Sequence, residues 1–74
     1  MLNYRDRIIS DYTVMLGKPV IKGTRITVEI ILKKLSEGAT IKDVLNMYPH
    51  IKEDDVLASL TYASEVIASE DVLD

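Results

Sequence analysis

The apolar residues between positions 27 and 70 recur at the spacing of a helix, and the pattern is interrupted at Gly38 and again at Pro49. Glycine commonly follows the last turn of a helix, and proline cannot continue one. The pattern therefore predicts three short amphipathic helices rather than one long helix. Their predicted apolar faces are Val28, Ile31, Leu32 and Leu35, then Ile41, Val44, Leu45 and Tyr48, then Val56, Leu60, Ala63 and Ile67.

Residues suited to capping stand at the start of each predicted helix. Thr27 can cap the first helix, and Thr40 followed by Asp43 is a variant of the capping box for the second. The acidic residues 53–55 favour the positive end of a helix dipole and predict the start of the third helix near Glu53. Only residues 49–52 separate the second and third helices, a turn short enough for a helix-turn-helix unit.

The first 26 residues carry the signals of extended chain. Pro19 suits the start or edge of a strand, and Gly23 can supply the positive φ of a tight turn. We expect a small hairpin at this turn, in which Val20–Ile21 pairs with Arg25–Ile26. The apolar runs Ile8–Ile9 and Val14–Leu16 are also interpreted as extended segments of this part of the chain.

Together these patterns predict an α+β fold that is mostly α. A short N-terminal β-hairpin or strand element precedes a three-helix bundle with a helix-turn-helix arrangement. The expected division is 1–26 for the β element, 27–70 for the bundle and 71–74 for an acidic tail, all within one domain.

The small size of the chain limits how it can be stabilised. A chain of 74 residues buries a limited fraction of its surface, and domains of this size often use a metal, disulfides or a second subunit. The absence of cysteine excludes disulfides, and the single histidine, His50, leaves no plausible zinc site. We therefore expect a homodimer with no metal and no cofactor, and the N-terminal strands could join its two copies. No signal peptide or membrane span is apparent, so the expected location is the cytoplasm.

Charge is divided unevenly along the chain. Residues 1–34 contain seven basic and three acidic side chains, whereas residues 35–74 contain two basic and nine acidic ones. Such asymmetry suggests that the two halves face different partners, although a short chain can also divide unevenly by chance. The basic side chains could contact nucleic acid, bind an acidic pocket on a protein, or simply be solvated. The candidate binding residues are Lys18, Lys22, Arg25, Arg5 and Arg7.

Two further functional classes can be weighed from the residues. Residues 53–74 contain no Arg, Lys, Asn or Gln, so the third helix is poorly suited to lie in a DNA groove. For an enzyme, His50 has no serine or cysteine at a recognisable spacing, and no phosphate loop or dinucleotide motif is present. We therefore expect a binding module that is not an enzyme.

The run Gly17–Ile26 resembles the signature of the family known as domain of unknown function 433. Within it, Gly17, Pro19, Gly23 and Thr24 are the candidate turn and structural residues. The resemblance continues through the predicted helices, over roughly residues 7–67. Family members tend to have threonine or serine before the acidic start of the last helix, where this chain has Lys52. Asp54 or Asp55 would then cap this helix, or its first turn would fray.

The resemblance implies a homeodomain-like trihelical fold and a bacterial antitoxin that is paired with a PIN-like nuclease and that could bind operator DNA as a dimer. A cationic hairpin carrying Lys22 and Arg25 could then occupy the acidic metal cluster of the nuclease, and the acidic C-terminal half could cover the nuclease's basic rim. The alternatives are a DNA-binding transcriptional regulator with a helix-turn-helix core, and a structural or interaction domain without a toxin.

Overall fold

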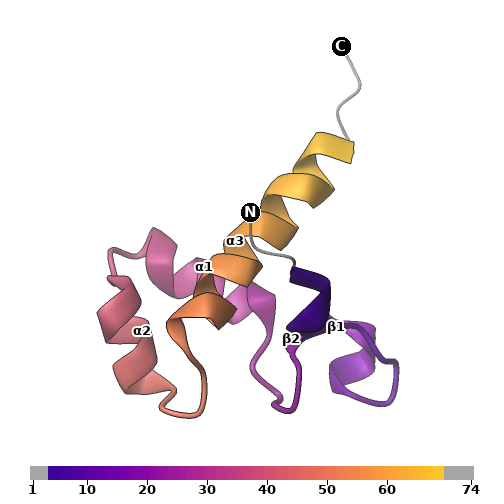
Figure 1. Ribbon diagram of the computed structural model, residues 1–74, viewed down its shortest axis with the longest axis horizontal. Helices are drawn as coiled ribbons and strands as arrows, with labels where there is room; N and C mark the ends of the chain where they lie inside the picture. Colours follow the sequence, from indigo (N-terminus) through magenta and orange to yellow (C-terminus); the bar gives the residue numbers. More distant parts are fainter. Residues whose placement is uncertain (1–3, 70–74) are drawn as a thin grey trace.

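The computed structural model describes residues 4–69 and consists of a small N-terminal β element followed by three helices (Figure 1). This confirms the predicted α+β, mostly α, fold. The predicted acidic tail, 71–74, lies outside the described residues. In chain order the elements are the 3-10 turn η1 (Tyr4–Asp6), β1 (Ile8–Ile9), the 3-10 turn η2 (Met15–Gly17), β2 (Val20–Ile21), α1 (Val28–Ser36), α2 (Ile41–Met47) and α3 (Glu53–Ser69).

The two strands pair with each other across a long loop. β1 and β2 are antiparallel, with Ile8 opposite Ile21 and Ile9 opposite Val20. The predicted pairing of Val20–Ile21 with Arg25–Ile26 was wrong as a strand pair, although the chain does turn back at Gly23. The Ile21 amide donates to the Ile26 carbonyl at 2.9 Å, but 25–26 form no strand. The pairing with β1 is favoured because it brings the Ile8 side chain into the core, where it is 7% exposed.

The N-terminal part is also less extended than the sequence predicted. Its apolar run Val14–Leu16 leads into η2, where Met15, Leu16 and Gly17 all have positive φ, at 52°, 57° and 86°. The loop is closed by the Ser10 hydroxyl, which donates to the Gly17 carbonyl. An apolar triplet alone could not distinguish this closed loop from a strand.

The predicted caps of the first two helices are confirmed. The Thr27 hydroxyl accepts a hydrogen bond from the Ile30 amide at the start of α1. At the start of α2, Thr40 and Asp43 form the complete capping box. Gly38, with φ of 103°, follows the C-cap of α1, and α2 ends two residues before Pro49.

The third helix begins at Glu53, as predicted, and Asp55, one of the two residues expected to cap it, takes part in its cap. The residue before it is Lys52, whose side chain cannot accept a hydrogen bond from the helix amides. The Asp55 carboxylate instead accepts a hydrogen bond from the Lys52 amide at 2.8 Å. Asp55 therefore supplies one half of a capping box from within the first turn.

The core lies where β1, β2 and the three helices meet. The predicted faces of α1 and α2 supply the buried residues Val28, Ile31 and Val44. On α3 the predicted stripe was partly wrong, because Leu60 is 42% and Ile67 is 67% exposed. The buried hydrophobic residues of the core are Ile8, Val20, Ile21, Val28, Ile31, Val44, Ile51, Val56 and Ala58.

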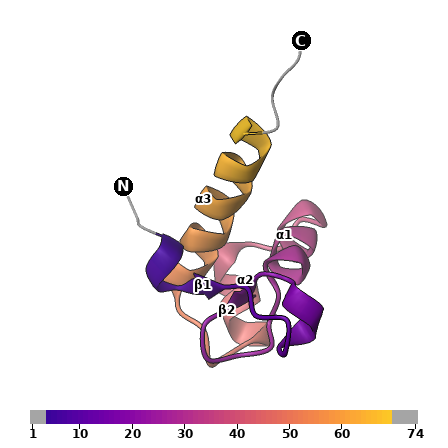
Figure 2. The ribbon, with the colours of Figure 1, turned by 90° about the vertical axis from the view of Figure 1, so that its right-hand side faces the viewer.

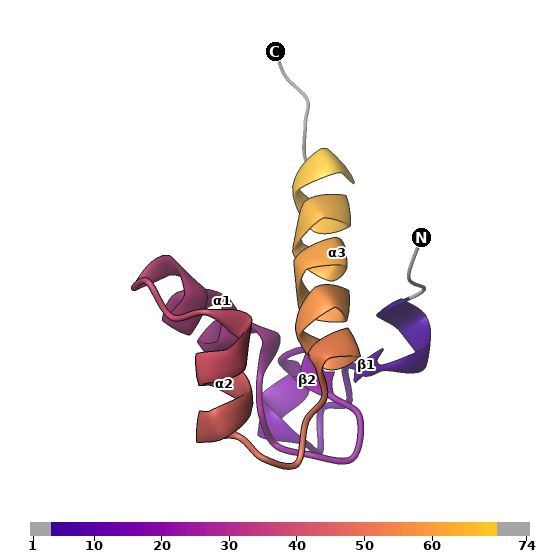
Figure 3. The same cartoon turned by 60° about the vertical axis from the view of Figure 1, so that its left-hand side comes forward.

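The exposure on α3 follows from its length. Figures 2 and 3 show its C-terminal half rising clear of the rest of the fold, with α1 diverging from it. Only the first half of α3 is enclosed, through Asp55, Val56, Ala58 and Ser59. Asp55 and Ser59 can be buried because both are hydrogen-bonded, with the Ser59 hydroxyl donating to the Asp55 carbonyl at 3.0 Å.

Candidate binding surface

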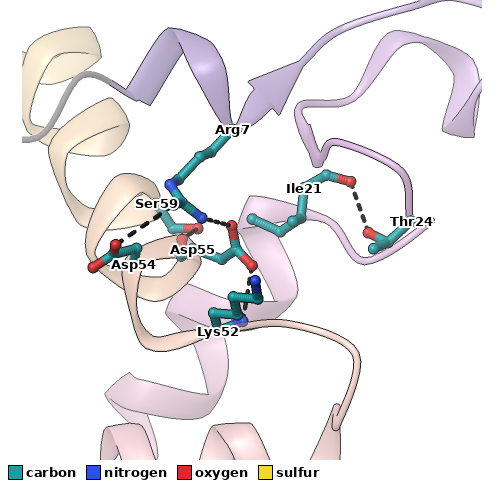
Figure 4. A network of polar contacts seen from close by, with 7 residues as sticks. All are labelled: Arg7, Ile21, Thr24, Lys52, Asp54, Asp55 and Ser59. Carbon is teal, nitrogen blue, oxygen red and sulfur yellow. Dashed lines mark hydrogen bonds and ion pairs between the residues drawn. The ribbon is translucent and has the colours of Figure 1, made fainter.

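Two of the five predicted binding residues form ion pairs within the chain. The Arg7 guanidinium lies 3.0 Å from Asp55 Oδ1 and 3.5 Å from Asp54 Oδ2, so it connects the N-terminal segment to the start of α3 (Figure 4). Lys18 Nζ lies 3.0 Å from Glu29 Oε1 at the start of α1. An outside partner would have to compete with these carboxylates for both side chains.

Arg5 lies against an aromatic pair. Its guanidinium carbon is 5.2 Å from the centroid of the Tyr4 ring, within the range of a cation–π contact. Tyr4 in turn packs edge-on against Tyr62 of α3, with ring centroids 5.3 Å apart. Arg5 therefore lies on η1, beside α3, and not on the turn between β2 and α1.

Lys22 and Arg25 differ from the other three. Both are exposed on the turn between β2 and α1, and within residues 4–69 neither side chain has a hydrogen bond or an ion pair. The turn passes through Gly23, whose φ of 84° favours glycine because glycine has no Cβ. Both positive charges are therefore displayed without an ion pair in the described part of the chain.

Thr24 holds the backbone of this turn in place. Its hydroxyl donates to the Ile21 carbonyl at 2.8 Å and accepts from the Ile26 amide at 2.9 Å. The Thr24 amide also donates to the Ile21 carbonyl, at 2.9 Å. Figure 4 shows Thr24 facing Ile21 across the turn. The turn is thus ordered before any partner binds.

Two residues from the α2–α3 turn lie close to this pair and were not among the predicted site residues. Lys52 and Lys22 line one hollow of about 350 Å³, together with Asp6, Arg7 and Asp55. His50 and Arg25 line a second hollow, together with Gly23 and Thr24. We call Lys22, Arg25, His50 and Lys52 the cationic face.

The cationic face joins residues that are distant in the sequence. No local pattern links Lys52 to Lys22, because the fold alone brings their two turns together. The one available sign was that Lys52 occupies a position where a capping side chain would be expected. The face is suited to binding carboxylates or phosphates.

The part of the chain that the structure describes offers little else for chemistry. Within residues 4–69, no group of three or more His, Asp or Glu side chains is placed to hold a metal ion. Thr13 donates side-chain and backbone hydrogen bonds to Asp11, and both lower the pKa of that carboxyl. Across these residues, no helix has the length and apolar character required to cross a membrane.

Comparison with known proteins supports the fold and a family. The structure resembles the crystal structure of a DUF433 member protein from Anabaena variabilis ATCC 29413, with a TM-score of 0.80 and 26% sequence identity. The alignment covers 88% of this chain and 64% of that one, so this chain spans about two thirds of the length of that relative. No curated protein matches the sequence. Residues 8–63 match the family described as "Protein of unknown function (DUF433)", and the chain belongs to this family.

Proposed function

We propose that this protein is an antitoxin-like binding module that neutralises a PIN-like ribonuclease, without catalytic activity of its own, in the bacterial cytoplasm. The observation that carries this proposal is the ordered turn on which Lys22 and Arg25 are exposed with no acidic partner among the described residues. The antitoxin role itself comes from the family resemblance.

The chemistry of the turn suits an acidic cluster. A nuclease that binds metal ions through several carboxylates presents concentrated negative charge when the ions are absent. Arginine can bind a carboxylate with two parallel hydrogen bonds, and lysine adds a compact positive charge. Lys22 and Arg25 would occupy this cluster in place of metal, and Lys52 would add a third charge beside Lys22.

Order in the turn favours tight binding. A segment that is already held in one conformation loses less entropy on binding than a flexible one. The hydrogen bonds of Thr24 fix the backbone on both sides of Gly23, so little of the turn needs to be ordered by the partner.

The acidic C-terminal half would cover the basic, RNA-binding rim of the nuclease. If the acidic C-terminal half covers this rim, deletion of residues 69–74 should weaken inhibition of the nuclease.

The same face supports a second candidate function, a DNA-binding regulator, including autoregulation of an operon. Lys22 and Lys52 line one hollow and could contact phosphates. This version would use the turns and not α3, whose first turn carries Glu53, Asp54 and Asp55. The homeodomain-like trihelical fold that the resemblance implies would then serve as the scaffold of these turns, and α3 would not read bases. A structural domain without a toxin is the third possibility.

The test begins with the neighbouring genes and then measures inhibition of RNA cleavage by the PIN-like nuclease that the proposal expects to be encoded there. A Lys22→Ala, Arg25→Ala double variant should inhibit on the order of 100-fold less well, because truncating partners of buried charge pairs costs several kcal/mol. A Lys34→Ala, Lys42→Ala variant removes the same charge from α1 and α2 and should inhibit like the wild type. Equal inhibition by both variants would contradict the proposed contact.

Duplex DNA binding separates the two candidate functions. We would titrate random duplex at low and at physiological salt with the same variants. Binding that falls steeply with salt and is lost only in the Lys22, Arg25 variant would support the DNA-binding function, since counterion release produces this dependence. Absence of binding, together with inhibition of the nuclease, would support the antitoxin function alone.

A further inference from the structure

The C-terminal half of α3 and the outer side of α1 form an open groove. The two helices diverge in Figure 3, and the hollow between them has a volume of about 620 Å³. Most of its lining is apolar. We call it the α1–α3 groove; its main lining residues are Val28, Leu32 and Ser36 on α1 and Tyr62, Val66 and Ile67 on α3.

The charged residues at the rim of this groove are already paired within the chain. Glu29 forms its ion pair with Lys18 at 3.0 Å, and Lys33 lies 3.6 Å from Glu37 one helical turn away. The groove therefore presents apolar surface, and the charges of Glu29 and Lys33 at its rim are already neutralised by their ion pairs. Its electrostatic complement is an uncharged, apolar segment rather than an acidic or basic one.

Such a segment exists on α3 itself. Between positions 56 and 69 the only charged residue is Glu65. Leu57, Leu60 and Ile67 are 37%, 42% and 67% exposed. Successive members of this set are three and then seven residues apart, which places all of them on one side of the helix. This side lies next to the groove, because Ile67 belongs to both. Exposed apolar side chains that recur on one side of a helix can form part of an interaction site.

We propose that the α1–α3 groove is occupied by α3 of a second copy of this chain. Each α3 then lies in the groove of the other, in a symmetric dimer. The groove and the exposed side of α3 are neighbouring parts of one surface, as the self-complementary interface of a two-fold dimer requires. Ala63 lies between Tyr62 and Ile67 at the groove, and its small side chain lets the two helices approach closely.

The dimer would also support the part of α3 that the monomer leaves without neighbours. An isolated helical segment of two or three turns is marginal in water, and most helical stability comes from packing of an apolar face. The interface differs from the one that the sequence suggested, which joined the N-terminal strands. It does not depend on the nuclease or on DNA.

The first test is sedimentation equilibrium of the full chain, from low micromolar to near-millimolar concentration, with two lysine variants. Ile67→Lys places a charge in the proposed interface and should raise the dimer dissociation constant on the order of 10- to 100-fold. Leu16→Lys is the matched control, because Leu16 is 75% exposed and lies on η2, outside the groove. It should leave the constant within about twofold.

A cysteine cross-link locates the interface independently. The chain has no native cysteine, so Ala63→Cys introduces a single thiol where the two helices would meet. Under mild oxidation it should form a disulfide dimer, whereas Tyr12→Cys, on an exposed loop, should stay mostly monomeric. A monomeric wild type, or a dimer that Ile67→Lys leaves intact and that Ala63→Cys cannot cross-link, would overturn the proposal.

Discussion

The Arg7 guanidinium lies 3.0 Å from the carboxylate of Asp55, which is 7% exposed and 48 positions later in the sequence. The same carboxylate accepts the Lys52 amide at 2.8 Å, and the Asp55 carbonyl accepts the Ser59 hydroxyl at 3.0 Å. One aspartate therefore joins the N-terminal segment to α3 and completes the start of that helix (Figure 4). Its ion pair with Arg7 is one of the contacts that hold the β element against α3, beside the core packing of Ile8 and Ile21.

Replacement of Asp55 should be strongly destabilising. Asp55→Ala removes the partner of Arg7 and leaves the Lys52 amide without its acceptor, so the free energy of unfolding should fall by about 2–4 kcal/mol. Asp55→Asn keeps an acceptor for that amide and should cost less. Urea denaturation followed by circular dichroism measures both changes. A loss below about 1 kcal/mol for the alanine variant would contradict this role.

A double-mutant cycle isolates the ion pair from the cap. Arg7→Ala combined with Asp55→Asn should give a coupling free energy of about 1 kcal/mol, because Asp55 is buried while the Arg7 side chain is 31% exposed. The matched cycle on Lys18 and Glu29, whose side chains are 56% and 71% exposed, should give at most about 0.5 kcal/mol. Equal couplings would show that burial of Asp55 does not strengthen its pair.

Thr24 should contribute both to stability and to partner binding. Thr24→Val keeps the shape of the side chain but removes the hydroxyl that bonds Ile21 and Ile26, so we expect a loss of about 1–2 kcal/mol in unfolding free energy. The looser turn should also weaken whatever binds Lys22 and Arg25. Thr61→Val, at a threonine of α3 whose hydroxyl has no hydrogen bond among the described residues, should change stability by less than about 0.5 kcal/mol. Unfolding midpoints in urea distinguish the two.

Gly23 should be sensitive to backbone conformation rather than to crowding. No atom lies within 4 Å of a Cβ built there, so an added methyl group would meet nothing. The φ of 84° nonetheless makes Gly23→Ala costly by about 1–2 kcal/mol. Gly23→Asn should cost less, because asparagine tolerates the left-handed region. Thermal unfolding of the two variants tests this order, and an alanine variant as stable as the wild type would contradict it.

The features that the sequence predicted correctly depend on neighbouring residues. Thr27, Thr40 with Asp43, and Gly38 all act within one helical turn, so their identity and spacing were sufficient. The fold class followed from the same local patterns. Pro49 stops the second helix because its ring removes the backbone N–H and clashes with the preceding turn.

The features that the sequence missed depend on distant contacts. Val20 and Ile21 could have paired on either side, and the choice of β1 was made by core packing that no local motif encodes. Helical spacing predicts a core stripe of Val56, Leu60, Ala63 and Ile67, yet it does not say how far along α3 the rest of the fold reaches. Val56 is buried in the core of the monomer, whereas the monomer gives no reason for the exposed Leu60 and Ile67 to be apolar, and the proposed dimer uses these two.

The candidate site divides in the same way. The basic side chains were identified by composition, but only the fold separates Arg7 and Lys18, which are paired within the chain, from Lys22 and Arg25. The contribution of Lys52 arises from two turns that meet in space. Composition shows that this part of the chain is positively charged, whereas only the structure shows which of its charged side chains have no ion pair.

Asp11 offers a test of the loop before β2 that is independent of the core. Its carboxylate accepts the Thr13 hydroxyl at 2.7 Å and the Thr13 amide at 2.9 Å, and these bonds hold the pKa of Asp11 below the ordinary value of an aspartate. Since the folded pKa is depressed, the bonds stabilise the native loop above the ordinary pKa, and this contribution is lost as pH falls through the folded pKa. Carbon-detected NMR titration should show the depressed midpoint. Thr13→Ala removes the larger of the two effects and should move the midpoint upward without restoring it fully, because the backbone amide still donates. An unchanged midpoint in this variant would mean that the hydroxyl does not bond the carboxylate in solution.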